Sequence, residues 1–248
     1  MDRPLSDIVV LDLTRALAGP IAQLRSRVDF LILLSDLTTA DNDQAGSAWY
    51  NPAVDSHYGI HVSFSYYSGG GSGADGISFF LFDGGESSPG LGAPGGGLGY
   101  KNVQGAYLGV GLDSFGNFLS LDSWTTGVGH GTFSNYVSLR GHGDPGSGYK
   151  YLAGSAVDTS DYGVSDSNYG IDGPTWRLVD LTITADQLLT LKMSWDDGAN
   201  WETLLTNYDL NSTNNIEGYT VPTTLKLGFA GSTGGAVDLH QIDNVTLA

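Results

Sequence analysis

Oxygen-bearing residues gather in one short stretch of the chain. Asp113, Phe115 and Asn117 occupy alternate positions, and Asp122 follows nearby. Where a strand runs into a loop, alternate residues point the same way, so Asp113 and Asn117 can face one point, with the Phe115 carbonyl between them. Two carboxylates, an amide oxygen, a carbonyl and water form the oxygen set that calcium prefers. The spacing therefore predicts a Ca²⁺ site at these four residues, although short Asp/Asn turns without metal are common.

Two further segments could contribute to the same chemistry. Asp75 lies two residues before an apolar run at residues 77–82. A carboxylate at the entrance to an apolar sheet needs a partner, unless it is a turn residue open to solvent. The second segment, residues 94–100, reads Pro-Gly-Gly-Gly-Leu-Gly-Tyr. It lacks the Lys-Ser/Thr pair that follows in a phosphate-binding loop, which argues against nucleotide binding.

The elements that must position these residues are mostly strands. Apolar runs and alternating patterns are separated by clusters of Gly, Asp, Asn and Pro, which predicts a sandwich or barrel. Asp196-Asp197-Gly198 marks a tight hairpin. Residues 16–27 favour a helix, and residues 84–100 and 141–173 read as long loops. The expected strands cover residues 8–13, 58–65, 77–82, 106–113, 136–140, 176–184, 188–195, 201–206 and 224–230.

Composition excludes several classes of function. The chain has 248 residues, a formal net charge of −17 and no cysteine. Such an acidic surface repels phosphate backbones and anionic lipid, so neither nucleic acid nor a membrane surface is an expected partner. Disulfides and thiol nucleophiles are absent, and no apolar run is long enough for a transmembrane helix. The N-terminus carries aspartates and is a poor secretory signal.

Taken together, these motifs resemble the legume-type (L-type) lectin family. The segments at residues 44–50, 74–81, 95–100, 108–122, 225–232 and 238–247 match it in order. The resemblance implies an all-β fold, a concanavalin-like antiparallel β-sandwich or jelly roll, spanning residues 29–248. It also implies a carbohydrate-binding protein that is not an enzyme, in the manner of bacterial members of the family.

The resemblance assigns a role to each site residue. Asp75, preceded by a cis peptide, would accept hydrogen bonds from two sugar hydroxyls, and Gly96 or Gly97 would donate a backbone N–H. Asn117 would bind both calcium and sugar, and Phe115 would place its ring against the sugar while its carbonyl binds the metal. The ion would orient these groups without itself touching the sugar.

The chain departs from the plant members of the family at the residues that hold a second metal ion, a transition metal, beside the calcium. The plant proteins place a Glu two residues before the first Asp and a His five residues after the second, where this chain has Gly111 and Gly127. His130 lies nearby at a different spacing. We therefore expect calcium without a transition metal.

The first residues do not fit this resemblance. Residues 3–20 are similar to the start of family III CoA-transferases, and nothing later in the chain matches that fold. We interpret residues 1–28 as an atypical segment, a fused or mis-joined start, to which no activity is assigned. Residues 9–13 could substitute for an edge strand of the sandwich.

The sequence thus predicts a calcium-dependent lectin module that recognises glycans or glycoconjugates, as a homo-oligomer or a repeat within a larger protein. Because extracellular calcium is millimolar, an extracellular or cell-surface location is expected. One alternative is a structural or adhesive module that binds protein or peptide through a degenerate sugar site. A sandwich-fold glycoside hydrolase is less favoured, because only three Glu are present, at scattered positions.

Overall fold

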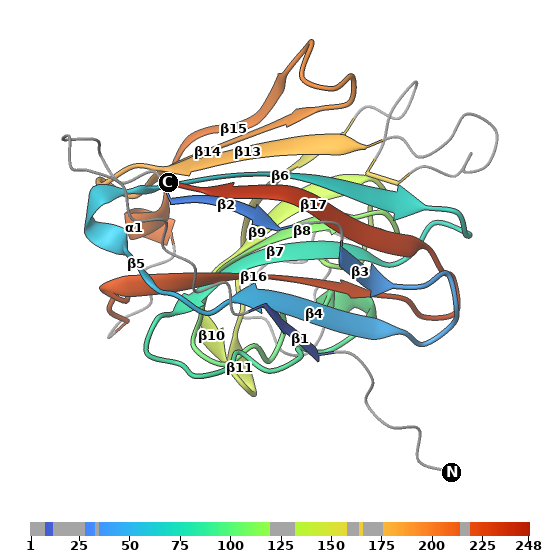
Figure 1. Ribbon diagram of the computed structural model, residues 1–248, viewed down its shortest axis with the longest axis horizontal. Coiled ribbons are helices and arrows are strands. Elements are labelled where there is room, and N and C mark those ends of the chain that lie inside the picture. Colours follow the sequence, from blue (N-terminus) through green and yellow to red (C-terminus); the bar gives the residue numbers. More distant parts are fainter. Residues whose placement is uncertain are drawn as a thin grey trace.

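The computed structural model describes residues 8–11, 28–32, 35–119, 132–157, 164–165, 176–213 and 219–248. These residues form two β-sheets that face each other, as the separated layers of arrows in Figure 1 show. Almost all pairings are antiparallel, which confirms the predicted all-β sandwich. None of the helices in this part of the chain is long and apolar enough to cross a membrane.

The larger sheet carries the predicted site. It has ten strands, with β1-β4-β16-β7-β8-β10-β11 as its main path, β5 beside β16, β9 beside β8, and β12 beside β9. Its strands are β1 (Ile8–Leu11), β4 (Ala45–Tyr50), β5 (Val54–Asp55), β7 (Gly76–Asp83), β8 (Ala106–Asp113), β9 (Tyr136–Arg140), β10 (Gly143–Asp144), β11 (Ser147–Gly148), β12 (Tyr151–Ala156) and β16 (Thr224–Ser232).

The smaller sheet covers one face of the larger one. It has seven strands in the order β15-β14-β13-β6-β17-β2, with β3 also beside β17. Its strands are β2 (Val28–Ile32), β3 (Ser35–Thr38), β6 (Ile60–Gly69), β13 (Arg177–Ile183), β14 (Leu188–Ser194), β15 (Glu202–Asp209) and β17 (Leu239–Leu247). Three short helical turns complete the described elements: η1 (Ser56–Tyr58), η2 (Gly95–Gly97) and α1 (Leu210–Thr213).

Two apolar clusters hold this arrangement together. One fills the space between the sheets and includes Phe64, Phe79 and Phe229, whose rings pack on one another. The other contains Tyr100 and Phe118, which lie against the opposite face of the ten-stranded sheet. That sheet is therefore buried on both faces, which explains why β7 and β8 read as nearly continuous apolar runs.

The strands predicted from residue 58 onward are present, with every end within four residues of its expected position. The hairpin at Asp196-Asp197-Gly198 joins β14 to β15, with Asp197 and Gly198 at positive φ. The predicted loop at residues 141–173 was partly wrong, because it contains β10, β11 and β12. The β12 sequence, Tyr-Leu-Ala-Gly-Ser-Ala, is half-buried up to its exposed last residue and has no clear alternation to reveal it.

The N-terminal segment contributes to the ten-stranded sheet. Strand β1 pairs in parallel with β4, which places Ile8 opposite Ser47 and Leu11 opposite Tyr50. The expectation that this segment supplies an edge strand agrees with this pairing. The helix expected at residues 16–27 lies outside the described residues, and β2 begins at Val28, the last residue of the proposed N-terminal segment.

Candidate functional site

The start of β7 and the end of β8 bring two of the predicted motifs together. Gly76 lies opposite Asp113 in the antiparallel register, so Asp75 sits beside the loop that follows β8. The Asp75 carbonyl accepts the N–H groups of Ser114 (3.1 Å) and Phe115 (3.2 Å), while the Asp75 N–H donates to Ser232 (2.9 Å). The Ala74–Asp75 peptide is cis, as the resemblance implied. The main chain of Asp75 is thus fixed by β16 on one side and by the β8 loop on the other.

The Asp75 side chain is buried but incompletely satisfied. It is 5% exposed, and Oδ2 has no hydrogen-bond partner among the residues that the structure describes. Burial raises the pKa of this carboxyl to about 6. Buried polar atoms are nearly always paired in folded proteins, and an unpaired carboxylate oxygen is costly. Such an atom at the rim of a loop cluster is a candidate ligand contact.

Asp113 forms the base of the neighbouring loop. It is fully buried, with Oδ1 accepting the N–H of Gly116 (2.7 Å) and Oδ2 that of Phe118 (2.6 Å). Burial raises its pKa to about 7 and the nearby Asp75 charge adds to this, while the two backbone hydrogen bonds lower it. Two carboxyl groups therefore lie close together where water solvates them poorly, and a cation would favour their ionised forms.

Phe115 and Asn117 project from the same loop. Phe115 is 45% exposed, so its ring is open to solvent beside the buried Asp113. The Asn117 amide lies against Gly96, since a Cβ built on Gly96 would come within 2.9 Å of Asn117 Cγ. Glycine is required at position 96 for this approach. The structure thus places Asp113, Phe115 and Asn117 in one loop and puts Gly96, which only the family resemblance had singled out, against Asn117.

The glycine turn is tied to the sheet from two sides. Ser232 Oγ donates to the Gly95 carbonyl (3.2 Å), and Ser78 Oγ donates to the Leu98 carbonyl (2.6 Å). The Gly97 N–H is already used within the turn, where it donates to the Pro94 carbonyl (3.3 Å). Of the two glycines predicted as donors to a ligand, Gly96 is therefore the better placed.

The oxygen donors of this loop suit a hard cation. Within the described ranges no group of three or more His, Cys, Asp or Glu side chains could hold a metal. The set proposed here instead combines one described carboxylate, Asp113, with an amide and a backbone carbonyl, a mixture typical of calcium and not of zinc. The fourth predicted ligand, Asp122, lies outside the described residues, as do Gly127 and His130.

Gly111 has no room for the glutamate that plant lectins carry at this position. A Cβ at Gly111 would lie 2.2 Å from Cδ1 and 2.5 Å from Cε1 of Phe118, whose ring contacts the strand there. The space beside Asp113 is therefore filled by an aromatic ring.

One contributor to the site was not found from the sequence. A Cβ at Gly234, in the loop between β16 and β17, would lie 3.4 Å from Asp75 Oδ2. Asn42 Nδ2 donates to the carbonyls of Gly234 and Gly235, both at 3.0 Å, which fixes the loop. The only signal was a Ser-Thr-Gly-Gly run between two strands, and that run equally fits an ordinary turn.

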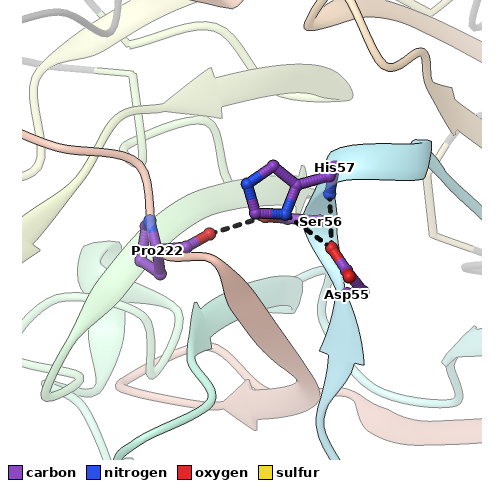
Figure 2. Close-up of polar contacts among 4 residues, drawn as sticks. All are labelled: Asp55, Ser56, His57 and Pro222. Carbon is purple, nitrogen blue, oxygen red and sulfur yellow. Dashed lines mark hydrogen bonds and ion pairs between the residues drawn. The ribbon is translucent and has the colours of Figure 1, made fainter.

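A cluster with the residue types of a hydrolytic triad lies at η1, and Figure 2 shows its geometry. His57 Nδ1 contacts Asp55 Oδ1 at 2.7 Å, as a triad requires. The Ser56 hydroxyl, however, donates to the Pro222 carbonyl (2.6 Å) and is buried. A serine whose proton is committed to a backbone carbonyl is not activated by the imidazole, so this arrangement does not support hydrolysis.

The acidic pair at Asp196-Asp197 also has a structural explanation. Asp196 accepts hydrogen bonds from Ser194 Oγ (2.8 Å), Asn200 N–H (2.9 Å) and Asn200 Nδ2 (2.7 Å). These bonds, those from Asn200 foremost, hold the pKa of Asp196 below its usual value. The carboxylate shapes the hairpin, as the sequence predicted, and is not part of a catalytic pair.

Comparison with solved structures places the fold. No family model matches the sequence. The exoplasmic/lumenal domain of VIP36 with calcium and mannose bound is similar over 88% of this chain and 80% of its own, with 20% identity and a TM-score of 0.57. Metal-free lectin I-B4 from Griffonia simplicifolia is similar over 88% and 89%, with 16% identity and a TM-score of 0.58. Peanut lectin with a nine-residue peptide is similar over 89% of each chain, with 18% identity and a TM-score of 0.55. The chain therefore has the β-sandwich fold of the legume-type lectins.

Proposed function

We propose that this protein is a calcium-dependent carbohydrate-binding module that recognises glycans through a shallow site at the Asp75 end of the ten-stranded sheet. The observation that carries the proposal is the buried Oδ2 of Asp75, which has no hydrogen-bond partner in the described part of the chain. It lies in a cluster whose other members are the exposed Phe115 ring and the glycine turn. An acceptor oxygen, a ring face and a backbone donor are the groups that bind a sugar's hydroxyls and its apolar face.

Calcium would be held by Asp113, the Phe115 carbonyl, Asn117 and Asp122. It would fix the Asn117 amide and neutralise charge beside Asp75. The sugar would then be bound by three groups with separate roles. Asp75 accepts hydrogen bonds from sugar hydroxyls, Gly96 donates through its backbone N–H, and the Phe115 side chain packs against the sugar ring. The ligands present in the VIP36 structure, calcium and mannose, support this assignment by similarity of fold.

A single shallow site of this kind binds weakly. A millimolar Kd corresponds to about 4 kcal/mol, so useful avidity needs several copies on an oligomer or within a larger protein. Extracellular calcium would keep such a site filled, and we accordingly place the module at the cell surface or outside the cell.

The proposal is tested on a glycan array. Wild-type protein is applied with calcium and with a chelator, and the Asp75→Asn and Asp197→Asn variants are applied with calcium. Asp197 is an exposed hairpin residue at positive φ, which Asn tolerates, so Asp197→Asn is a matched control. We expect defined glycans to bind wild type with calcium and not with chelator, Asp197→Asn to bind like wild type in calcium, and Asp75→Asn to lose binding.

Two results would redirect the assignment. If no glycan binds while calcium still raises the melting temperature, the metal site remains and a protein- or peptide-binding module becomes the leading function. The nine-residue peptide in the peanut lectin structure supports this alternative by similarity of fold. If Asp75→Asn binds as well as Asp197→Asn, the site lies elsewhere on the molecule.

A further inference from the structure

The outward face of β8 is built to receive aromatic rings beside the proposed calcium loop. Leu108, Val110 and Leu112 enter the core between the sheets, so Gly109 and Gly111 face the other way, in line with Asp113. The strand thus presents two glycines and then the buried carboxylate. A Cβ at Gly109 would lie 2.5 Å from the Tyr100 ring, and a Cβ at Gly111 would lie 2.2 Å from the Phe118 ring.

Phe118 connects this packed surface to the loop. Its ring is fully buried on Gly111, and its N–H donates to Asp113 Oδ2 at 2.6 Å. The loop that carries Phe115 and Asn117 is therefore closed at one end by β8 and at the other end by Phe118. Whatever holds Phe118 in place also sets the spacing of the proposed metal ligands.

Arg140 holds Phe118 from the neighbouring strand. It lies opposite Gly109 in the pairing of β8 with β9 and is 5% exposed. Nε donates to the Phe118 carbonyl at 2.6 Å, Nη2 donates to the same oxygen, and Nη1 donates to the Tyr149 carbonyl at 2.8 Å. The guanidinium carbon also lies 4.9 Å from the centroid of the Phe118 ring. One buried cation thus holds Phe118 by its carbonyl and covers its ring.

Burying a charge costs free energy unless the charge is fully hydrogen-bonded, so the position of the Arg140 guanidinium next to this loop needs an explanation. We propose that Arg140 is a positioning residue for calcium: it fixes Phe118 so that Asp113, the Phe115 carbonyl and Asn117 are already arranged when the ion binds. The inference rests on the proposed calcium site. Its physical basis is preorganisation, because a loop ordered beforehand loses less conformational entropy on binding.

The geometry requires arginine specifically. A lysine ammonium has no planar fork with which to hold the Phe118 carbonyl, reach the Tyr149 carbonyl and cover the ring at the same time. Substitutions that disturb a metal's outer support typically weaken binding by about 10- to 100-fold. We expect Arg140→Lys to lower calcium affinity by about tenfold, while sugar affinity at saturating calcium stays within about twofold of wild type.

Arg177 supplies the matched control. It is another buried arginine, 3% exposed, in the seven-stranded sheet, with its guanidinium carbon 6.0 Å from the Tyr66 ring centroid. Arg177→Lys should lower the free energy of unfolding without changing calcium affinity. A merely structural Arg140 would behave in the same way.

The experiment is a calorimetric calcium titration of wild type, Arg140→Lys and Arg177→Lys, with urea denaturation of each in chelator. A loss of calcium affinity confined to Arg140→Lys supports the inference, and equal affinities in all three overturn it while leaving the calcium site intact. If wild type itself binds no calcium, the proposed function and the inference both fail. If Arg140→Lys does not fold, Phe118→Leu decides, because it keeps the backbone contacts and removes the ring. That variant should bind calcium more weakly, and wild-type affinity would overturn the inference.

Discussion

Two aspartates at the same end of the sandwich differ in how fully their side chains are used. Asp238 is completely buried, and its oxygens accept hydrogen bonds from Ser165 Oγ (2.5 Å), Gly71 N–H (3.1 Å), Gly73 N–H (3.2 Å) and Ser68 Oγ (3.4 Å). Asp75 is 5% exposed and has an oxygen without a partner among the described residues. Burial raises the pKa of both carboxyls, but at Asp238 the four donors oppose the shift.

This difference in hydrogen bonding distinguishes a structural carboxylate from a candidate binding carboxylate. At Asp238 the side chain organises the fold, whereas at Asp75 the main chain does so, through its bonds to Ser114, Phe115 and Ser232. In the proposed function, the Asp75 carboxylate is the group that binds the ligand. A buried acid with every lone pair used is a structural group, and a buried acid with an orphan oxygen is a candidate binding group.

The largest expected effect is on stability at Asp238. Asp238→Asn should lower the free energy of unfolding by about 2–4 kcal/mol, because two backbone N–H groups lose a charged acceptor and the new amide N–H₂ faces donors. Urea denaturation in chelator measures this. A loss below about 1 kcal/mol would remove the distinction between the two aspartates.

The next largest effect is on the pH dependence of stability, through a buried histidine near Asp238. Thr38 Oγ1 donates to the Asp238 carbonyl and accepts from Nδ1 of His240, which is fully buried. Burial lowers the pKa of His240 to about 3, against about 6.5 in the unfolded chain. The unfolded state therefore binds the proton first, and stability falls as pH drops from about 6.5 towards 3, by about 2 kcal/mol at pH 5.

His240→Asn isolates this contribution, because the Asn amide can replace the Nδ1–H donor and does not titrate. The free energy of unfolding of wild type minus that of the variant should decrease between pH 7 and pH 5, with the titration of other groups cancelling. A difference that is constant over this range would show that His240 is accessible to protons in the folded state.

A smaller effect concerns the ligand region. Phe115→Ala should weaken glycan binding by about fivefold, or ~1 kcal/mol, because the exposed ring loses its contact with the sugar, while stability changes little. Trp201→Ala is the control, since Trp201 is similarly exposed, at 43%, beside the β14–β15 hairpin. Glycan affinities of both variants are measured at saturating calcium. Equal losses of glycan affinity in Phe115→Ala and Trp201→Ala would indicate that glycans contact exposed aromatic rings nonspecifically.

The smallest effect is on stability at Asp75. Because its folded pKa is raised, its charge opposes folding above about pH 6, and that penalty fades as the pH falls through about 6 towards 4. Asp75→Asn should therefore leave the free energy of unfolding at pH 7 in chelator unchanged, or raise it by about 1 kcal/mol. Urea denaturation of Asp75→Asn and Asp238→Asn under the same conditions compares the two sites. A similar loss of unfolding free energy in both variants would contradict the different roles assigned to the two aspartates.

The sequence was most informative where local pattern decides structure. Residues at β13 alternate between buried and half-buried, so their strand could be predicted, and the Asp113–Asn117 spacing places its side chains within one loop. The roles of Asp75 and Asp238 could not be separated in this way. The donors that satisfy Asp238 come from residues more than 70 positions away, and no local pattern reports them.

The same limit explains the other omissions. Arg140 follows an ordinary strand pattern, and only the register of β8 with β9 places it under Phe118. Gly234 reads as a turn residue until the loop is seen against Asp75. Strand β12 ends in four small residues, Ala-Gly-Ser-Ala, and only its pairing with β9 identifies it as a strand.

The central claim, that calcium organises a site in which Asp75 is free to bind sugar, is tested most directly by calorimetry in both directions. The sugar is titrated at several calcium concentrations, and calcium is titrated with and without saturating sugar, using a glycan identified on the array. The account predicts that calcium tightens sugar binding and that sugar tightens calcium binding by the same factor, as thermodynamic linkage requires. Sugar affinity that is the same in calcium and in chelator would contradict it.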